Sequence, residues 1–441
     1  MILIFAVNLE LAAHAGQLLA GAARISITPS ADEFPCDGPG NRKFVGVHDD
    51  VYVRVLVLDD GKQRIGLVIL DQTKVPSSLD LVKAVAQELA VPESHVLVSA
   101  THTHNVPLVS YNGGTPNKVQ QTELEHLQQA AVAAARQAKA QLQPARIAFA
   151  RGEAWVNENG GSYLSPTNSG KMEAQEDIYF PQRPSDKSVD VVRVESLKGE
   201  PLALLLNYAT HGEVMFRSVT KDNGYEISGD LPGAVAHLLE GSSAAAPIVL
   251  FTSGAEADQL PLFKSLQPTG KLGAADEGAG GWALLDAQAR RLANSVLDSL
   301  ADMQPGVADV QLSASAGTVT CPGKYVSNPH ESAPADTAVP LVKIPISIFR
   351  INDIALAGVG GDVASEIGQR FKKASPLAHT TFISMMAGDI GYILTDAIYE
   401  DKSLGENHGV GKSPLKSGCA EPAIIQGLLG LIGTDSKDSN K

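Results

Sequence analysis

The chain has 441 residues, of which 44% are hydrophobic and 19% are charged, a composition typical of a globular protein rather than a disordered or fibrous one. Its formal net charge is −14 and its Lys and Arg residues do not cluster, so we expect no nucleic-acid or anionic-membrane partner. The three cysteines lack a CxxC spacing, which excludes a thiolate zinc cluster and allows one disulfide at most. These limits favour a small molecule as the ligand.

The first residues, MILIFAVNLELAAHAGQ, combine a short apolar run with Ala13-His14-Ala15, which fits the small-x-small cleavage site of an export signal. We therefore expect residues 1–15 to be a signal peptide and the protein to be secreted or periplasmic. The missing charged start and the intruding Glu10 keep a cytoplasmic location as the alternative. No later run is long and apolar enough to span a bilayer, so an integral membrane protein is not predicted.

Strand-like and helix-like segments alternate along the chain, by hydrophobic periodicity and β-branched content. In chain order we expect a strand pair at 51–58 and 65–70, a helix at 79–89, a strand at 96–100, a helix at 122–142, a strand at 146–150, a strand pair at 189–196 and 201–211, a strand at 247–254, a helix at 282–303, a strand pair at 344–351 and 353–359, and helices at 363–373 and 422–432. Antiparallel pairs mixed with crossover helices predict a single large α/β domain with mixed β-sheets and flanking helices.

Two irregular stretches, 157–187 and 261–281, are rich in Gly, Ser, Pro and Asn, and we expect long loops there. Such loops either line a site or are simple surface excursions. The polar tail at 434–441 is expected to fray.

The stretch VLVSATHTHNVP sets His102 and His104 one residue apart at the end of a buried strand. Alternation along a strand would place both imidazoles on one face, where they could meet one ion; a solvated histidine pair is the alternative. His211 closes another apolar strand, in LLLNYATH. Asp362 follows the strand and glycines of AGVGGD at the start of the helix predicted at 363–373, where a helix cap is the alternative reading.

Taken together, six segments in this order resemble the neutral and alkaline non-lysosomal ceramidases: VSATHTHNVP, NYATHGEV, SGDLPG, FTSGAEADQLP, GGDVASEIGQRF and GDIGYILTDAIYE. The resemblance runs from about Ala22 to the C-terminus. It implies a ceramidase-like zinc hydrolase domain at 22–433, of the family's catalytic type, without the immunoglobulin-like C-terminal domain of true ceramidases.

The same resemblance implies one zinc ion and a set of site residues. The family's four metal ligands fall on His102, His211, Asp362 and Tyr392. His104 is then either the proton shuttle or a hydrogen-bonding neighbour of a ligand, and Asp258 is expected to orient ligands or loops.

Two departures from the family's motifs bear on the substrate. Leu260 stands where ceramidases have a serine, and Leu404 stands where they have a tyrosine, which argues against ceramide itself. Metal-activated water does not depend on Leu260. The sequence therefore predicts a divergent zinc-dependent hydrolase of a linear, ceramide-like N-acyl amide with a hydrophobic part. An ester or lactone hydrolase of the same fold, and a metal-bearing protein that binds its ligand without turnover, are the alternatives.

Overall fold

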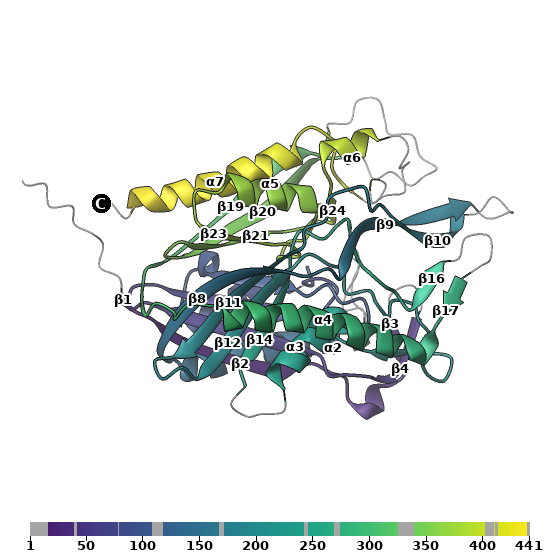
Figure 1. Ribbon diagram of the computed structural model, residues 1–441, viewed down its shortest axis with the longest axis horizontal. Helices are drawn as coiled ribbons and strands as arrows, with labels where there is room; N and C mark the ends of the chain where they lie inside the picture. The colour runs from purple at the N-terminus through teal and green to yellow at the C-terminus, as the bar shows by residue number, and fades with distance from the viewer. Residues whose placement is uncertain are drawn as a thin grey trace, which may run out of the picture.

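The computed structural model places two β-sheets face to face, with helices on both outer surfaces (Figure 1). It describes residues 16–38, 42–77, 79–107, 118–166, 172–241, 246–268, 274–324, 339–401, 410 and 413–438. The predicted signal peptide at 1–15 and the departure at Leu404 lie outside this part of the chain. Within it, no helix is both long and apolar enough to cross a membrane.

The larger sheet has eight strands in the described residues, in the order β14-β12-β11-β8-β2-β5-β6-β7. In that order their bounds are Ile248–Ser253, Pro201–Tyr208, Ser188–Ser196, Gln143–Glu153, Leu19–Ser26, Tyr52–Asp59, Arg64–Leu70 and Val96–Ala100. Neighbours are antiparallel except for the parallel pairs β12 with β14 and β6 with β7. The sheet is therefore mixed, as predicted.

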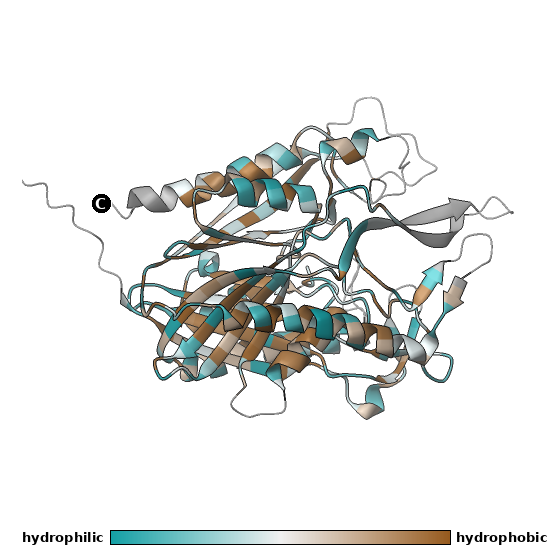
Figure 2. Cartoon of the chain, in the orientation of Figure 1, coloured by the Kyte–Doolittle hydropathy of each residue, from teal (hydrophilic) through white to brown (hydrophobic). Residues whose placement is uncertain are grey.

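The smaller sheet has four strands in the described residues, in the order β19-β20-β21-β23. Their bounds are Leu312–Pro322, Leu341–Ile351, Ile354–Val359 and His379–Ile383. Its Phe349 and Leu356 pack in one buried cluster with Leu56 and Leu67 of the larger sheet. Strands buried on both faces read as continuous apolar runs, which is why VYVRVLVL and IALAGV lack polar alternation (Figure 2).

Helices cover the outer face of each sheet. Their bounds are α1 Leu81–Leu89, α2 Lys118–Ala140, α3 Asp230–Glu240 and α4 Gly281–Ala301 on the larger sheet, and α5 Ser365–Ala374 and α7 Ala420–Asp438 on the smaller one, with α6 Asp396–Glu400 nearby. Helix α2 turns alanines toward its sheet, which lets it approach closely: a Cβ on Gly21 would lie 2.1 Å from the Ala138 carbonyl oxygen. Small residues therefore set the distance between helix α2 and the larger sheet.

The remaining strands form smaller sheets. They are β1 Gly16–Gln17 with β18 Asp309–Val310; β3 Cys36–Gly38, β4 Arg42–Val47 and β13 Tyr225–Ile227; β9 Asn157–Pro166, β10 Met172–Tyr179 and β15 Gln259–Pro261; β16 Leu266–Pro268 with β17 Ala274–Asp276; and β22 Asp362–Val363 with β24 Tyr392–Ile393. Three-residue 3-10 helices lie at Ala31–Glu33, Glu93–His95 and Gly278–Gly280.

The predicted strand pairs at 51–70, 189–211 and 344–359 are confirmed as β5-β6, β11-β12 and β20-β21. Strand β12 ends at Tyr208, however, so His211 lies three residues beyond the strand that it was expected to close. The loop predicted at 157–187 is wrong, because β9 and β10 pair antiparallel there. The segment is rich in Gly, Ser and Asn, which are not typical of strands. The loop at 261–281 contains the short pair β16-β17. Helix α7 continues to Asp438, into the tail that was expected to fray.

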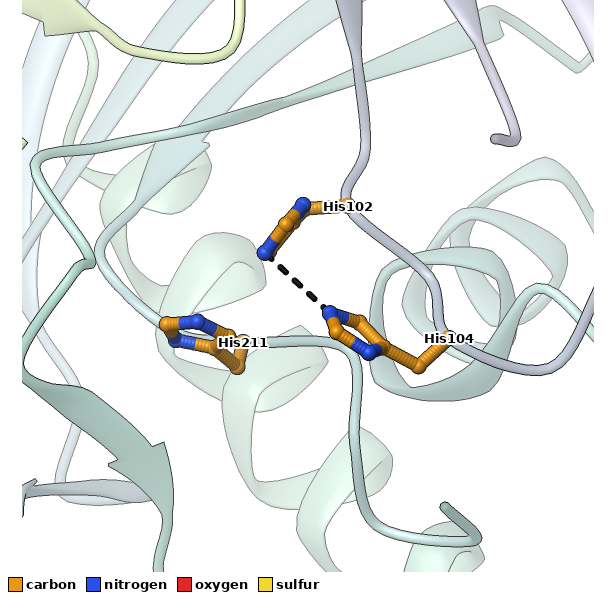
Figure 3. Close-up of side chains that lie close together, drawn as sticks. All are labelled: His102, His104 and His211. Carbon is orange, nitrogen blue, oxygen red and sulfur yellow. Dashed lines mark hydrogen bonds between the residues drawn. The ribbon is translucent and has the colours of Figure 1, made fainter. Parts of the chain in front are cut away.

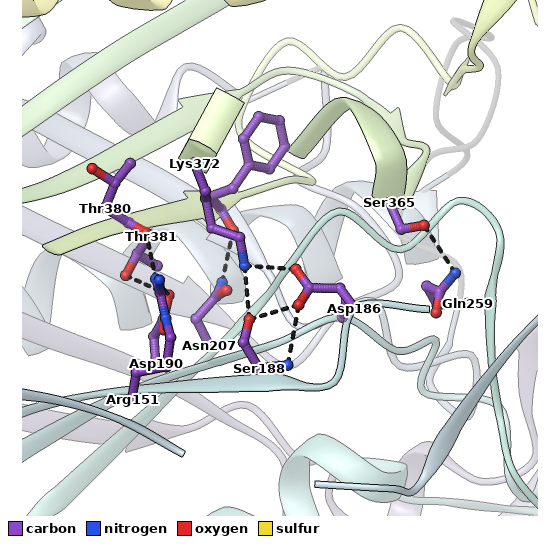
Figure 4. Close-up of polar contacts among 12 residues, drawn as sticks. Arg151, Asp186, Ser188, Asp190, Asn207, Gln259, Ser365, Lys372, Thr380 and Thr381 are labelled. Atoms are coloured by element: carbon purple, nitrogen blue, oxygen red, sulfur yellow. Dashed lines mark hydrogen bonds and ion pairs between the residues drawn. The ribbon is translucent and has the colours of Figure 1, made fainter. Parts of the chain in front are cut away.

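A polar network ties the two sheets together on the side of α5 (Figure 4). Nη2 of Arg151, on β8, donates to the Thr380 carbonyl oxygen at 2.7 Å, while Asp190 of β11 accepts from Arg151 and from Thr381. Lys372 of α5 donates to Asp186 at 2.6 Å. These contacts seat β23 and α5 on the larger sheet and so help to place the segment that carries Asp362.

A disulfide joins Cys321, in β19, to Cys419, just before α7. The single bridge that three cysteines allow is therefore present, and the buried Cys36 is free. Burial, with the charge of Glu123 next in importance, raises the pKa of the Cys36 thiol to about 12. Cys36 is consequently a packed and unreactive thiol.

Burial also acts on Glu123 of α2, where the nearby charges of Glu33 and Asp37 add to it and raise the carboxyl pKa from 4.5 to about 7. The folded protein then binds this proton more tightly than the unfolded chain does, so the carboxyl destabilises the fold progressively as pH rises from about 4.5 to 7. Glu123→Gln is expected to raise the free energy of unfolding by about 1–2 kcal/mol at pH 8, discounted for partial exposure, with little change at pH 4.

Urea unfolding at both pH values measures this effect. Glu125→Gln, an exposed change on the same helix, is the matched control and should alter stability little at either pH. Equal effects of Glu123→Gln at pH 4 and pH 8 would contradict the assignment.

Candidate metal centre

His102 and His104 lie just beyond β7, which ends at Ala100. The prediction that strand alternation aligns them is wrong: His102 has a left-handed φ of 60°, so the chain turns before His104. The two imidazoles nevertheless converge, with their Nε2 atoms 3.1 Å apart (Figure 3). A turn, rather than a strand, brings both rings to one point.

The second histidine segment approaches the first through backbone contacts. Thr103 forms a parallel bridge with Gly212, and the His104 amide donates to the Gly212 carbonyl oxygen at 2.9 Å. A Cβ on Gly212 would lie 2.9 Å from Cα of Thr103, so a larger residue would push the segments apart. The glycine after His211 therefore lets that imidazole reach the pair.

His102, His104 and His211 form a cluster whose ligand nitrogens lie within 4.8 Å of one another, as a shared metal ion requires. A carboxylate completes this group: Oδ2 of Asp362 lies 3.8 Å from Nε2 of His102 and 3.6 Å from Nε2 of His211. The structure therefore brings together three of the four predicted ligands and the predicted proton-handling histidine.

Two of the three imidazoles have a backbone carbonyl oxygen within hydrogen-bonding distance of Nδ1. Nδ1 of His102 lies 2.6 Å from the Thr73 carbonyl oxygen, and Nδ1 of His211 lies 3.1 Å from the Gln259 carbonyl oxygen. A carbonyl oxygen only accepts, so Nδ1 of each ring carries a proton and Nε2 faces the centre. Metal-binding histidines are held in this way.

Asp362 reaches the centre from β22, which pairs with β24, and not from the start of a helix. The expected helix position is wrong because α5 begins at Ser365 with Ala364 as its N-cap. Within the described residues, Oδ1 of Asp362 is buried and has no hydrogen-bond partner. A buried carboxylate oxygen without a donor fits a cation site.

The centre attracts positive charge. Burial would lower the pKa of His211, but the Asp362 carboxylate outweighs it and raises this pKa to about 10. Burial lowers the pKa of His104 to about 3 and that of His102 well below its usual range, so both rings are neutral. A divalent metal would displace the extra proton of His211, and imidazoles beside a carboxylate are a donor set that such metals take up.

The last two predicted residues lie around this group. The backbone of Tyr392 pairs with Asp362, and its partly buried side chain packs beside the apolar cluster under α5 and α7. Asp258 is buried and accepts hydrogen bonds from the Ser365 amide at 2.8 Å and from Asn159 at 2.9 Å. Asp258 thus holds the start of α5, and it directly precedes Gln259, which anchors His211.

Sequence reasoning missed three buried charged residues. Glu213 lies 3.2 Å from Nδ1 of His104 and 2.9 Å from Nζ of Lys264. Glu256 is fully buried, and burial together with the Asp362 charge raises its pKa well above the usual value. The position of Glu213, two residues after His211 in the motif NYATHGEV, could have indicated that it lies near the site. Lys264 lies in a stretch that was expected to be a loop, so nothing in the sequence indicated its role.

The fold and the site define an α/β protein of two facing mixed sheets with a buried histidine and carboxylate centre where strands end. The family model described as "Neutral/alkaline non-lysosomal ceramidase, N-terminal" matches residues 19–255, just over half of the chain. The chain belongs to this family, as the order of its motifs predicted.

Relatives and solved structures agree with this assignment. Neutral ceramidase A and neutral ceramidase B of Dictyostelium discoideum are each 27% identical, over 39% and 50% of this chain, and the matches span 23% and 31% of those proteins. The crystal structure of neutral ceramidase from Pseudomonas aeruginosa superposes with a TM-score of 0.69 at 15% identity, over 96% of this chain and 75% of that one. A ceramidase complexed with C2 gives 0.70 at 14% identity, over 96% and 76%. At such identities the likeness establishes the fold.

Proposed function

We propose that this protein is a zinc-dependent hydrolase that cleaves an N-acyl amide bond in a small, ceramide-like substrate. The observation that carries the proposal is the convergence of three imidazole nitrogens within 4.8 Å of one another, with Asp362 beside them. Membership of the ceramidase family supports amide hydrolysis as the reaction. One ion at this centre is the cofactor that we propose.

His102, His211 and Asp362 would hold the ion, and the neighbouring Tyr392 is proposed as a further ligand. Two imidazoles and a carboxylate are a common catalytic zinc set. When bound, zinc lowers the pKa of a coordinated water to about 7 and polarises a carbonyl oxygen. A bound metal ion would displace the extra proton of His211 and leave only neutral and anionic donors, which suit a divalent cation.

His104 is proposed to handle protons. Its neutral Nε2 faces the centre 3.1 Å from Nε2 of His102, where it can accept a proton from water and pass it to the leaving nitrogen. Asp258 positions the start of α5 and the strand that anchors His211, and its part in the reaction is indirect.

The substrate is proposed to be a linear amide with a hydrophobic part rather than ceramide itself. Leu260, buried in β15, replaces a serine of the family, so a serine-assisted contact has no counterpart there. Ester cleavage is the near variant, because the same centre would polarise an ester carbonyl.

A panel of N-acyl amines of increasing chain length, with matched esters, tests the proposal on zinc-loaded protein with and without a chelator. We expect turnover that a chelator abolishes and zinc restores. Absence of metal-dependent turnover of every amide and ester would replace the proposal with a metal-bearing binding protein.

We also propose that the protein works outside the cytoplasm. The Cys321–Cys419 disulfide supports this proposal, because structural disulfides persist in oxidising compartments. Fractionation of the native host, with mass spectrometry of the mature N-terminus, tests it.

A further inference from the structure

We propose that the cavity between helix α2 and the ends of strands β2 and β6 is a second ligand site, which binds a small apolar primary amine with its ammonium group against Glu123. The cavity has a volume of about 350 Å³, which lies in the range of small-molecule sites. None of its lining residues is a proposed metal ligand, so binding at this site can be measured without any turnover.

Apolar side chains of the larger sheet and of α2 line one part of this cavity. They belong to Ile25, Ile27, Val51, Leu127, Ala130 and Ala133. The two alanines of α2 leave room that larger side chains would fill. Burial of an alkyl chain against these side chains favours binding in proportion to the apolar area that leaves water.

Two polar side chains in the cavity lining have no partner in the protein. Gln72 follows β6 and is only 8% exposed, yet within the described residues its side-chain amide forms no hydrogen bond. In the same part of the chain, the carboxyl group of the partly buried Glu123 of α2 has none either. Because a buried amide without a partner costs free energy, its place in a cavity lining indicates a polar occupant.

Other polar groups in the lining are already engaged within the protein. Oγ1 of Thr28 accepts a hydrogen bond from the Val51 amide at 2.9 Å. Oε2 of Glu33 accepts one from the Ser30 amide at 2.6 Å. The polar group of a ligand is therefore directed to the two side chains without partners.

The charges around the cavity favour a cation. Glu123 and Glu33 line it together with the exposed His126, and no Lys or Arg is among its lining residues in the described chain. Burial, with the charges of Glu33 and Asp37 adding to it, raises the pKa of the Glu123 carboxyl to about 7. An ammonium group against this carboxyl would offset the repulsion, whereas an anion would add to it.

One turn of the chain joins the cavity to the metal centre. Gln72 directly precedes Thr73, whose carbonyl oxygen lies 2.6 Å from Nδ1 of His102 and whose hydroxyl donates to the Thr103 carbonyl oxygen at 2.9 Å. Hydrolysis of an N-acyl amine releases an amine, so the proposed reaction would supply a ligand of the class that the cavity fits. Only this link rests on the proposed function.

Calorimetric titration of the full-length protein with n-octylamine at pH 8, where an alkylammonium is charged, tests the inference. We expect one octylamine site per chain, with 1-octanol and octanoate bound at least about tenfold more weakly. Glu123→Gln removes the charge but keeps the shape, so it should weaken octylamine binding at least about tenfold. Gln72→Met should weaken it about three- to tenfold, because it removes one hydrogen-bonding group.

Three further variants make the test specific. Ala133→Leu adds volume to the lining from a partly exposed position of α2 and should also weaken binding. Glu125→Gln, an exposed change on the same helix outside the lining, is the matched control and should bind octylamine as wild type does. His211→Ala alters the metal centre and should leave octylamine affinity within about twofold of wild type.

Wild-type affinity in Glu123→Gln, equal affinity for octylamine and octanol, or no octylamine binding at all overturns the inference. Loss of octylamine binding in His211→Ala also overturns it, because the amine would then bind at the metal centre. If octylamine binds as expected and no substrate is hydrolysed, the proposed function fails while the second ligand site is confirmed.

Discussion

His211→Ala is expected to lower amide hydrolysis by at least about a thousandfold and to remove most of the bound zinc. A metal centre contributes several kcal/mol of transition-state stabilisation, and about 4 kcal/mol corresponds to a thousandfold in rate. His211 is buried, and its Nε2 lies 3.6 Å from Oδ2 of Asp362, so the substitution removes a nitrogen donor from inside the centre. Elemental analysis and kcat/KM of the purified variant measure the two effects.

The control is His379→Ala, which removes a half-exposed imidazole at the start of β23, where it stacks on Phe149. It should leave zinc content and rate close to wild type. Equal zinc in His211→Ala and wild type would refute the proposed ligand set, even if the activity were lost.

Arg54→Met is expected to cost about 3–5 kcal/mol of the free energy of unfolding, because it leaves the buried Asp71 carboxylate without its cation and removes one of the two cations that contact Glu240. Arg54 lies on β5 with a side chain only 2% exposed, and it contacts Asp71 at 2.5 Å and Glu240 at 3.3 Å. Asp71 directly precedes the turn that carries Thr73, the anchor of His102, so zinc affinity should fall as well. Urea unfolding and competition with a chromogenic chelator for zinc measure both quantities.

Arg24→Met provides a matched comparison, since Arg24 pairs with the same Glu240 but is about one-third exposed. Solvent screens that pair, so its loss should cost about 1 kcal/mol or less. Equal costs for the two variants would show that burial does not decide the strength of this network. Restoring much of the stability of Arg54→Met by adding Asp71→Asn and Glu240→Gln would confirm that the unpaired charges cause the loss.

Local signals in the sequence predicted the main elements well where strands are buried on both faces. Runs such as VYVRVLVL and IALAGV lie between a helix layer and the facing sheet, so their side chains are apolar at every position but a few. The strands β9 and β10 were missed because they are built from Gly, Ser, Asn and charged residues, and their pairing with each other and with β15 holds them. Propensity carries little information for such strands.

The candidate site, too, could be predicted only in part from the sequence. The motifs placed His102, His104, His211 and Asp362 near strand ends, and their order along the chain identified the family. Their geometry could not be predicted, because it depends on the left-handed turn at His102 and on the close approach that Gly212 permits. Both features are set by packing between segments that are distant in sequence.

By itself the sequence determined the α/β class, the alternation of elements, the family and the residue types of the centre, since these follow from periodicity and motif order. Only the tertiary structure decided which atoms meet. The backbone oxygens that hold two of the imidazoles belong to Thr73 and Gln259, which come from different parts of the chain. A carbonyl oxygen has no residue type to recognise, and only folding brings Glu213 between His104 and Lys264.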